Sequence, residues 1–272
     1  CTLITGKRSL NSLVGVTVHE IAHAWFQFLL ATNETKHYWM DEGFASYIEE
    51  LALAEFYKHD KENIFTKAYK DYINLVLSGK EQPLSTHADR YKYNMAYGTA
   101  AYDKGLIFVS QLSYIIGEEN LAKTFKEYYK KWAFKHPTPN DFIRTAEKVS
   151  SIELDWYLND WTKTTNTIDY SVNTITEKNN STYIKLKREG LIPMPIEVEV
   201  EFMDSSKENY YIPLRMMRGE KPVDKKVIIL EDWAWAYPNY TFTINKPKRE
   251  IKKVIIDPKN IIADINKYNN TN

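Results

Sequence analysis

Two histidines and a glutamate stand close together near the start of the chain, in the run Val18-His19-Glu20-Ile21-Ala22-His23. The run lies within a strongly helical stretch, and residues four apart share one face of a helix. His19 and His23 can therefore direct both imidazoles at one Zn²⁺, with Zn–N distances of about 2.0–2.1 Å. Glu20 lies beside them and is expected to act on a water bound by that metal.

A third ligand is expected from Glu42, which is separated from His23 by eighteen residues and falls near the start of a second predicted helix. Alone, Glu42 could be a first-turn acid favoured by the helix dipole. Together with the two histidines it completes a catalytic His₂Glu site for one zinc ion per chain, which leaves the fourth position to water. The neighbouring Asp41 has two interpretations. It orients a ligand histidine, or it caps the helix.

These residues must be positioned by helices, which are predicted over the first 165 residues. Apolar residues recur at helical spacing there, and Gly117 and the pair Thr138-Pro139 are typical of a helix end and a helix start. The predicted helices cover residues 10–31, 40–57, 62–77, 94–116, 118–134, 139–149 and 153–163.

The period of the apolar pattern falls to two after about residue 165. Residues 195–202 alternate between apolar and acidic side chains, as a half-buried strand does. Strands are predicted at residues 182–187, 195–202, 211–217, 226–230, 240–244 and 251–256. We therefore expect an α+β chain with a mostly helical catalytic domain at 1–165 and a small antiparallel β-sandwich at 166–272.

The composition of the chain argues against several classes of function. The chain has 272 residues with 36 basic and 36 acidic side chains, so no nucleic-acid or membrane-surface partner is indicated. No apolar run approaches the roughly 18 residues that span a membrane. The single cysteine, Cys1, excludes an intrachain disulfide and leaves the compartment open, cytoplasmic or extracytoplasmic. Because the chain begins with Cys1 and not with Met, we expect it to be part of a longer protein.

The zinc segment resembles the gluzincin zinc aminopeptidases, peptidase family M1, which include alanyl aminopeptidases and leukotriene hydrolase. The family pattern is H-E-x-x-H, eighteen residues and Glu within N-E-G-F-A; here that last part reads Asp41-Glu42-Gly43-Phe44-Ala45. Thermolysin-type endopeptidases have one more residue in the gap. The resemblance implies a thermolysin-like zincin catalytic subdomain and a peptide substrate.

A second match is Tyr102-Asp103-Lys104-Gly105, which resembles the Y-x-K-G segment of the same family. The resemblance implies that Tyr102 stabilises the transition state, and a phenol can indeed donate to an oxyanion. Tyr97 also has a counterpart in part of the family. The G-x-M-E-N segment, whose Glu grips the substrate's amino group, does not occur in this sequence. We expect this segment, and a large N-terminal β-domain, in a part of the protein that precedes the chain.

Three hypotheses remain. The first is a zinc aminopeptidase in which His19, His23 and Glu42 hold the metal, Glu20 moves the proton and Tyr102 stabilises the oxyanion. The second is an endopeptidase of thermolysin type, because the anchor for the amino group is not in this sequence. The third is a zinc-binding scaffold without turnover of its own.

Overall fold

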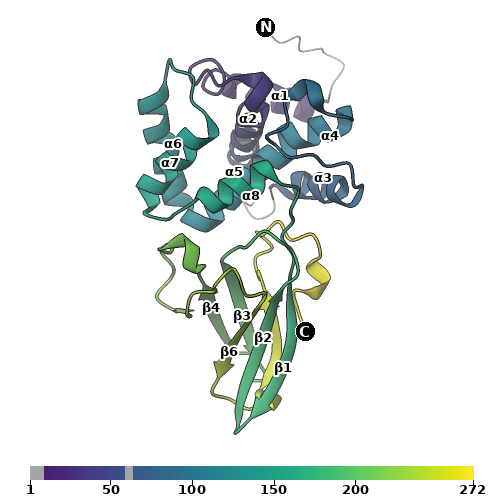
Figure 1. The fold of residues 1–272 in the computed structure, drawn as a ribbon, viewed down its shortest axis with the longest axis vertical. Helices are drawn as coiled ribbons and strands as arrows, with labels where there is room; N and C mark the ends of the chain where they lie inside the picture. Colours follow the sequence, from purple (N-terminus) through teal and green to yellow (C-terminus); the bar gives the residue numbers. More distant parts are fainter. Residues whose placement is uncertain (1–8, 59–63) are drawn as a thin grey trace. The chain divides into compact units, whose positions relative to one another are not determined.

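The computed structural model describes residues 9–58 and 64–272 (Figure 1). Its α-helices precede its β-strands, which confirms the α+β class. The α-helices are α1 (Leu10–Ala22), α2 (Glu34–Tyr57), α3 (Thr66–Leu77), α4 (Asn94–Thr99), α5 (Gly105–Ile116), α6 (Glu118–Trp132), α7 (Pro139–Ser150) and α8 (Asp155–Lys163). The beginning predicted for the third helix, at residues 62 and 63, lies outside the described residues. In the part that is described, no helix is both long and apolar enough to cross a membrane.

The chain divides into two compact units. The first contains the described residues up to Ser113, together with Glu118–Val149 and Leu158–Thr165. The second contains Tyr114–Gly117, Ser150–Tyr157 and Asn166–Asn272, so two short helical pieces belong with the strands. We propose that the change at residue 165 is the domain boundary.

The first helix is shorter than the predicted range 10–31. It ends at Ala22 with His23 as its C-cap. Beyond it, Gln27 has a φ of 87°, which a right-handed helix does not accommodate. The N–H of Ala31 donates to the carbonyl of Lys135 over 3.0 Å. Contact with this distant segment therefore overrides the local helical preference.

The second helix begins earlier than the predicted residue 40. The side chain of Asn33 caps it by accepting from the N–H of Lys36, and the helix is kinked at His37. Its middle turns pack into the aromatic core of the first unit, where Trp39 lies against Phe108 with ring centroids 4.8 Å apart. This buried stretch includes the residues on either side of Glu42.

The predicted helix at 94–116 is divided by a π-helical segment, η2 (Ala100–Lys104), between α4 and α5. The segment is followed by Gly105, which lies against Gly43 of α2. A Cβ added at Gly105 would be 2.8 Å from the carbonyl oxygen of Trp39 and 2.9 Å from the Cα of Gly43. The two glycines therefore allow α2 and the π-helical segment to approach closely.

Replacing Gly105 with Ala is expected to lower the free energy of unfolding by about 1–3 kcal/mol, because the new methyl group meets backbone atoms that cannot move alone. Gly98→Ala is the matched control, since a Cβ there meets nothing within 4 Å and alanine favours a helix. Chemical unfolding followed by circular dichroism measures both. Equal stability of the two variants would contradict the close contact.

The second unit holds two sheets. The first has the order β1-β2-β6, built from Tyr170–Lys178, Ser181–Arg188 and Asn239–Ile244. The second has the order β5-β4-β3-β7, built from Val227–Ile229, Lys207–Ile212, Ile196–Phe202 and Ile251–Ile256. Tyr210 and Phe242, one from each sheet, lie with ring centroids 5.1 Å apart. All strand pairs are antiparallel except β4–β5, which is parallel.

Two strands differ from the prediction. β1 is not among the predicted strands, because a bulge between Val172 and Thr174 breaks its period of two. The strand predicted at 211–217 ends at Ile212. Pro213 follows, which has no N–H to donate to a ladder, and residues Arg215–Met217 form a 3₁₀ turn.

Candidate active site

The first helix brings the two histidines of the H-E-x-x-H run together. The side chain of Ser9 caps α1 by accepting from the N–H of Ser12. His19 lies in the last turn of the helix and His23 at its C-cap, so both imidazoles project from one face. Their Nε2 atoms are 3.1 Å apart, with the rings edge to face.

The second helix adds Glu42 to this pair. α1 lies against α2, and the Oε2 atom of Glu42 is 3.1 Å from Nε2 of His19 and 3.4 Å from Nε2 of His23. Among the described residues, these three form the one group of His, Cys, Asp or Glu side chains close enough to hold a metal ion together. The structure thus brings together the three predicted ligands.

The spacing of these three atoms fits a tetrahedral metal ion. Bonds of about 2.0–2.1 Å at tetrahedral angles place neighbouring ligand atoms about 3.3–3.4 Å apart. The observed distances are 3.1, 3.1 and 3.4 Å. Two imidazole nitrogens and a carboxylate oxygen are also the donor set that catalytic zinc sites use. The residues present therefore fit Zn²⁺.

The outer nitrogens of both histidines contact carboxylates. Nδ1 of His23 lies 2.7 Å from Oδ1 of Asp41, and Nδ1 of His19 lies 3.0 Å from Oε2 of Glu49. Such contacts orient metal-binding imidazoles and raise their basicity. Of the two interpretations of Asp41, the 2.7 Å contact with His23 agrees with the orienting one.

Glu49 is not among the residues predicted from the sequence. It lies seven residues after Glu42 on α2, and that spacing is two helical turns, which places both side chains on one face. This spacing is a usable signal. It is obscured because α2 carries several acidic residues at similar positions, including the adjacent Glu50.

The site favours a positive charge where the three ligand atoms converge. Burial alone would lower the pKa of His19, but hydrogen bonds to Glu42 and Glu49 outweigh it and raise the pKa to about 9. The close carboxylates of Asp41 and Glu42 raise the pKa of His23 to about 10. A divalent cation supplies the same charge and takes the place of those protons, because a histidine must be neutral to bind a metal.

Tyr102 lies on the same side of the helices as the histidines. Its ring stacks on that of His19 with centroids 5.7 Å apart, and it lines the same cleft as Glu42. Burial and the charge of Glu42 raise the pKa of Tyr102, so the phenol keeps its proton and can donate it in a hydrogen bond. The π-helical segment that contains Tyr102 is of a kind found often at functional sites.

Tyr97 is placed differently. Its ring packs on those of Tyr38 and Tyr91, with centroids 4.9 and 5.6 Å away. Burial, followed by the charge of Glu42, raises the pKa of Tyr97. The residue therefore lies near the ligand cluster but is packed within an aromatic group.

A cleft of about 490 Å³ opens over the cluster. Glu20 lines it, together with residues of the same two helices and Tyr102; the lining comprises Asn11, Ser12, Gly15, Val16, His19, Glu20, His23, Glu42, Glu49, Leu53 and Tyr102. Three of these side chains are glutamates, and none is lysine or arginine. The structure thus places the proposed base and the candidate ligands around one space.

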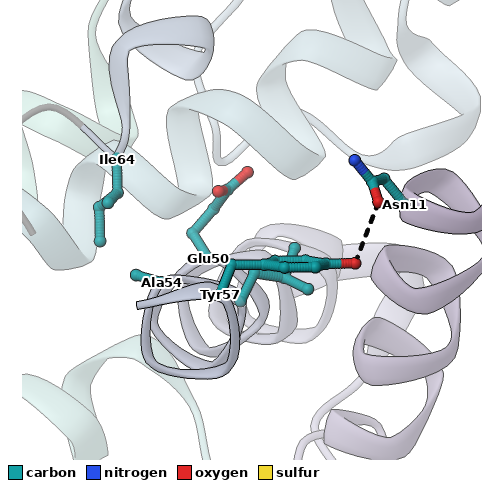
Figure 2. A pocket seen from close by; sticks show the side chains of 6 residues that line it. Asn11, Glu50, Ala54, Tyr57 and Ile64 are labelled. Carbon is teal, nitrogen blue, oxygen red and sulfur yellow. Dashed lines mark hydrogen bonds between the residues drawn. The ribbon is translucent and has the colours of Figure 1, made fainter. Parts of the chain in front are cut away.

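A second hollow of about 280 Å³ shares Asn11 and Leu53 with the cleft. Figure 2 shows the hydroxyl of Tyr57 donating to Oδ1 of Asn11 over 3.3 Å, with the carboxylate of Glu50 beside them. The cleft over the ligand atoms therefore borders the second hollow, which lies between α1 and α2.

A comparison with protein-family models supports the peptidase family that the motifs resemble. The model described as "Peptidase family M1 domain" matches residues 3–161, more than half of the chain. The chain belongs to peptidase family M1, as the resemblance of its motifs indicated.

Two curated relatives are aminopeptidases by name. "Aminopeptidase M1-D" of Oryza sativa subsp. japonica is 29% identical over 166 residues, which are 58% of this chain and 19% of the relative. "Leucine aminopeptidase 2" of Chaetomium globosum is 30% identical over 140 residues, which are 49% of this chain and 22% of the relative. The chain thus spans about a fifth of the length of the curated relatives it matches.

A solved structure extends the likeness to the strands. The crystal structure of Legionella pneumophila aminopeptidase A in complex with aspartic acid matches 93% of this chain and 26% of its own, with a TM-score of 0.53 and 14% identity. At that identity the likeness concerns the fold, and it includes the sheets as well as the helices.

Proposed function

We propose that this chain carries the catalytic centre of a zinc aminopeptidase, with one zinc ion per chain. The observation that carries the proposal is the convergence of His19, His23 and Glu42, whose ligand atoms are 3.1–3.4 Å apart at the base of a cleft that Glu20 also lines. A Zn²⁺ held there would polarise a peptide carbonyl and lower the pKa of a water.

The remaining steps belong to side chains of the cleft. Glu20 takes a proton from the attacking water and passes it to the leaving amine. The hydroxyl of Tyr102 donates a hydrogen bond to the oxyanion that develops on the scissile carbonyl. Asp41 and Glu49 hold the imidazoles of His23 and His19 in the orientation that binds the metal.

The charge of the cleft favours a substrate with a free amino group. Its lining has three glutamates and, among the described residues, no lysine or arginine. With the charge of one Zn²⁺ counted, three negative charges and two positive ones leave the lining negative by one charge, so an α-ammonium group is attracted. The names of the relatives agree with an exopeptidase.

A substrate panel tests this choice in the protein at its full natural length. Peptides with a free N-terminus should be cleaved one residue at a time, and the same peptides with an acetylated N-terminus should be stable. Internal cleavage of the acetylated peptides would indicate an endopeptidase of thermolysin type. Zinc binding without cleavage of either set would indicate a scaffold.

The role of Glu49 gives a prediction about the metal alone. Glu49→Gln removes the carboxylate behind His19 and should lower zinc affinity about 10- to 100-fold, measured by competition with a chelator. Glu50→Gln is the matched control, because this neighbour lines the second hollow. Equal zinc affinity in the two variants would show that Glu49 does not support the ligand.

A further inference from the structure

A lysine and a glutamate are buried as an ion pair behind the candidate active site. Nζ of Lys104 lies 2.6 Å from Oε1 of Glu81, and their side chains are 0% and 5% exposed. Aromatic rings flank the ammonium group, since Nζ is 5.8 Å from the ring centroid of Tyr72 and 5.7 Å from that of Trp161.

Stability does not account for such a pair. Moving two charges out of water carries a desolvation penalty that their mutual attraction rarely exceeds, and well-packed apolar residues of similar volume are often as stable or more stable. The best-attested benefit of a buried polar pair is to fix one register among several similar packings. The location of the pair indicates that this register is that of the π-helical segment η2.

Lys104 is the last residue of the π-helical segment that contains Tyr102. The two side chains point in different directions, because Tyr102 is 41% exposed beside the cleft while Lys104 is enclosed. A π turn carries one residue more than an α turn. If it relaxed to α-helix, the residues before it would rotate by about 100° relative to those after it.

The contact between Gly43 and Gly105 holds the C-terminal end of this segment against α2. That contact alone leaves the rotation of the preceding turn open. The bond from Lys104 to Glu81 lies next to it and ties the turn to the segment that follows α3.

We propose that the Lys104–Glu81 pair is a positioning device for Tyr102, which keeps the π turn in the register that directs the phenol at the metal ligands. The inference rests on the proposed function for the role of Tyr102 in turnover. Neither member of the pair reaches the cleft, so both act through Tyr102.

The test replaces the pair with apolar residues, as Lys104→Met with Glu81→Leu, in the zinc-loaded protein at full natural length. This double variant should keep its melting temperature and one zinc per chain. Its kcat should fall about as much as that of Tyr102→Phe, about 100-fold, because the oxyanion loses the same donor, while KM changes less than threefold. Lys104→Arg, which keeps the charge and a donor for Glu81, is the second variant and should keep kcat within threefold of the wild-type value; a loss as large as that of Tyr102→Phe would overturn the proposal.

A mutant cycle separates positioning from general damage. Tyr102→Phe should lower kcat about 100-fold in the wild-type background but less than threefold in the double variant, where the phenol is already displaced. Additive losses, or an unchanged kcat in the double variant, would overturn the proposal.

A spectroscopic measurement tests the placement of Tyr102 without an activity assay. With 3-fluorotyrosine at position 102, the ¹⁹F resonance should shift between the wild-type and double-variant backgrounds, whereas the same label at Tyr183 in the sheets should not. An unmoved signal at position 102 refutes the inference even if the protein cleaves no peptide. A shifted signal without turnover supports the positioning role and refutes only the proposed function.

Discussion

Glu20→Gln is expected to lower kcat about 10²- to 10⁴-fold and to leave the zinc content unchanged. The amide has the shape of the carboxylate but cannot accept the proton of the attacking water, and general-base catalysis contributes a factor of this size. Glu20 lines the cleft beside the three ligand atoms without belonging to the metal group. Steady-state kinetics on a free-N-terminus peptide and elemental analysis of the same sample measure both quantities.

Glu119→Gln is the matched control for this variant. It makes the same chemical change on α6, at a side chain that is 94% exposed, and it should leave kcat at the wild-type value. If Glu20→Gln retained near wild-type turnover, the base would have to be another group. If it lost zinc, its effect would be on the metal and not on the proton.

Tyr102→Phe is expected to lower kcat/KM about 10²- to 10³-fold with little change in zinc affinity. The substitution removes one hydroxyl and keeps the ring that stacks on His19. The loss corresponds to a single oxyanion donor. Kinetic assays with a free-N-terminus peptide, together with a chelator competition for zinc, provide the measurement.

Tyr97→Phe is the comparison within the same site. Tyr97 packs on Tyr38 and Tyr91, and we expect a loss of less than tenfold because its ring contacts are kept. Equal losses in the two variants would mean that both phenols stabilise the oxyanion. A larger loss for Tyr97→Phe would reverse the assignment.

The candidate site could be predicted largely because its chemistry depends on local geometry. The spacing of His19 and His23 fixes their common face on any regular helix. The eighteen-residue gap to Glu42 was informative only together with that pair, since the helix dipole alone favours an acid near a helix start. Glu49 could not be singled out, because its contact with His19 depends on how α1 lies against α2.

The parts of the fold that could not be predicted from the sequence depend on contacts between distant segments. The course of the chain after α1 depends on contacts with a distant segment, such as the hydrogen bond from Ala31 to Lys135. The π-helical segment depends on partners such as Gly43, and its residues follow an ordinary helical pattern in the sequence. The parallel pairing of β5 with β4 depends on how the chain between them returns, which no periodicity specifies.

The central claim is that His19, His23 and Glu42 form a zinc site, and metal content tests it most directly. Elemental analysis of the purified protein at full natural length, and of its Glu42→Ala variant, should give about one zinc per wild-type chain and a greatly reduced content in the variant. The loss is expected because removing one of three protein ligands leaves two imidazoles, too few for a catalytic zinc site. A folded wild-type protein without zinc, or a Glu42→Ala variant that binds zinc as tightly as the wild type, would contradict the claim.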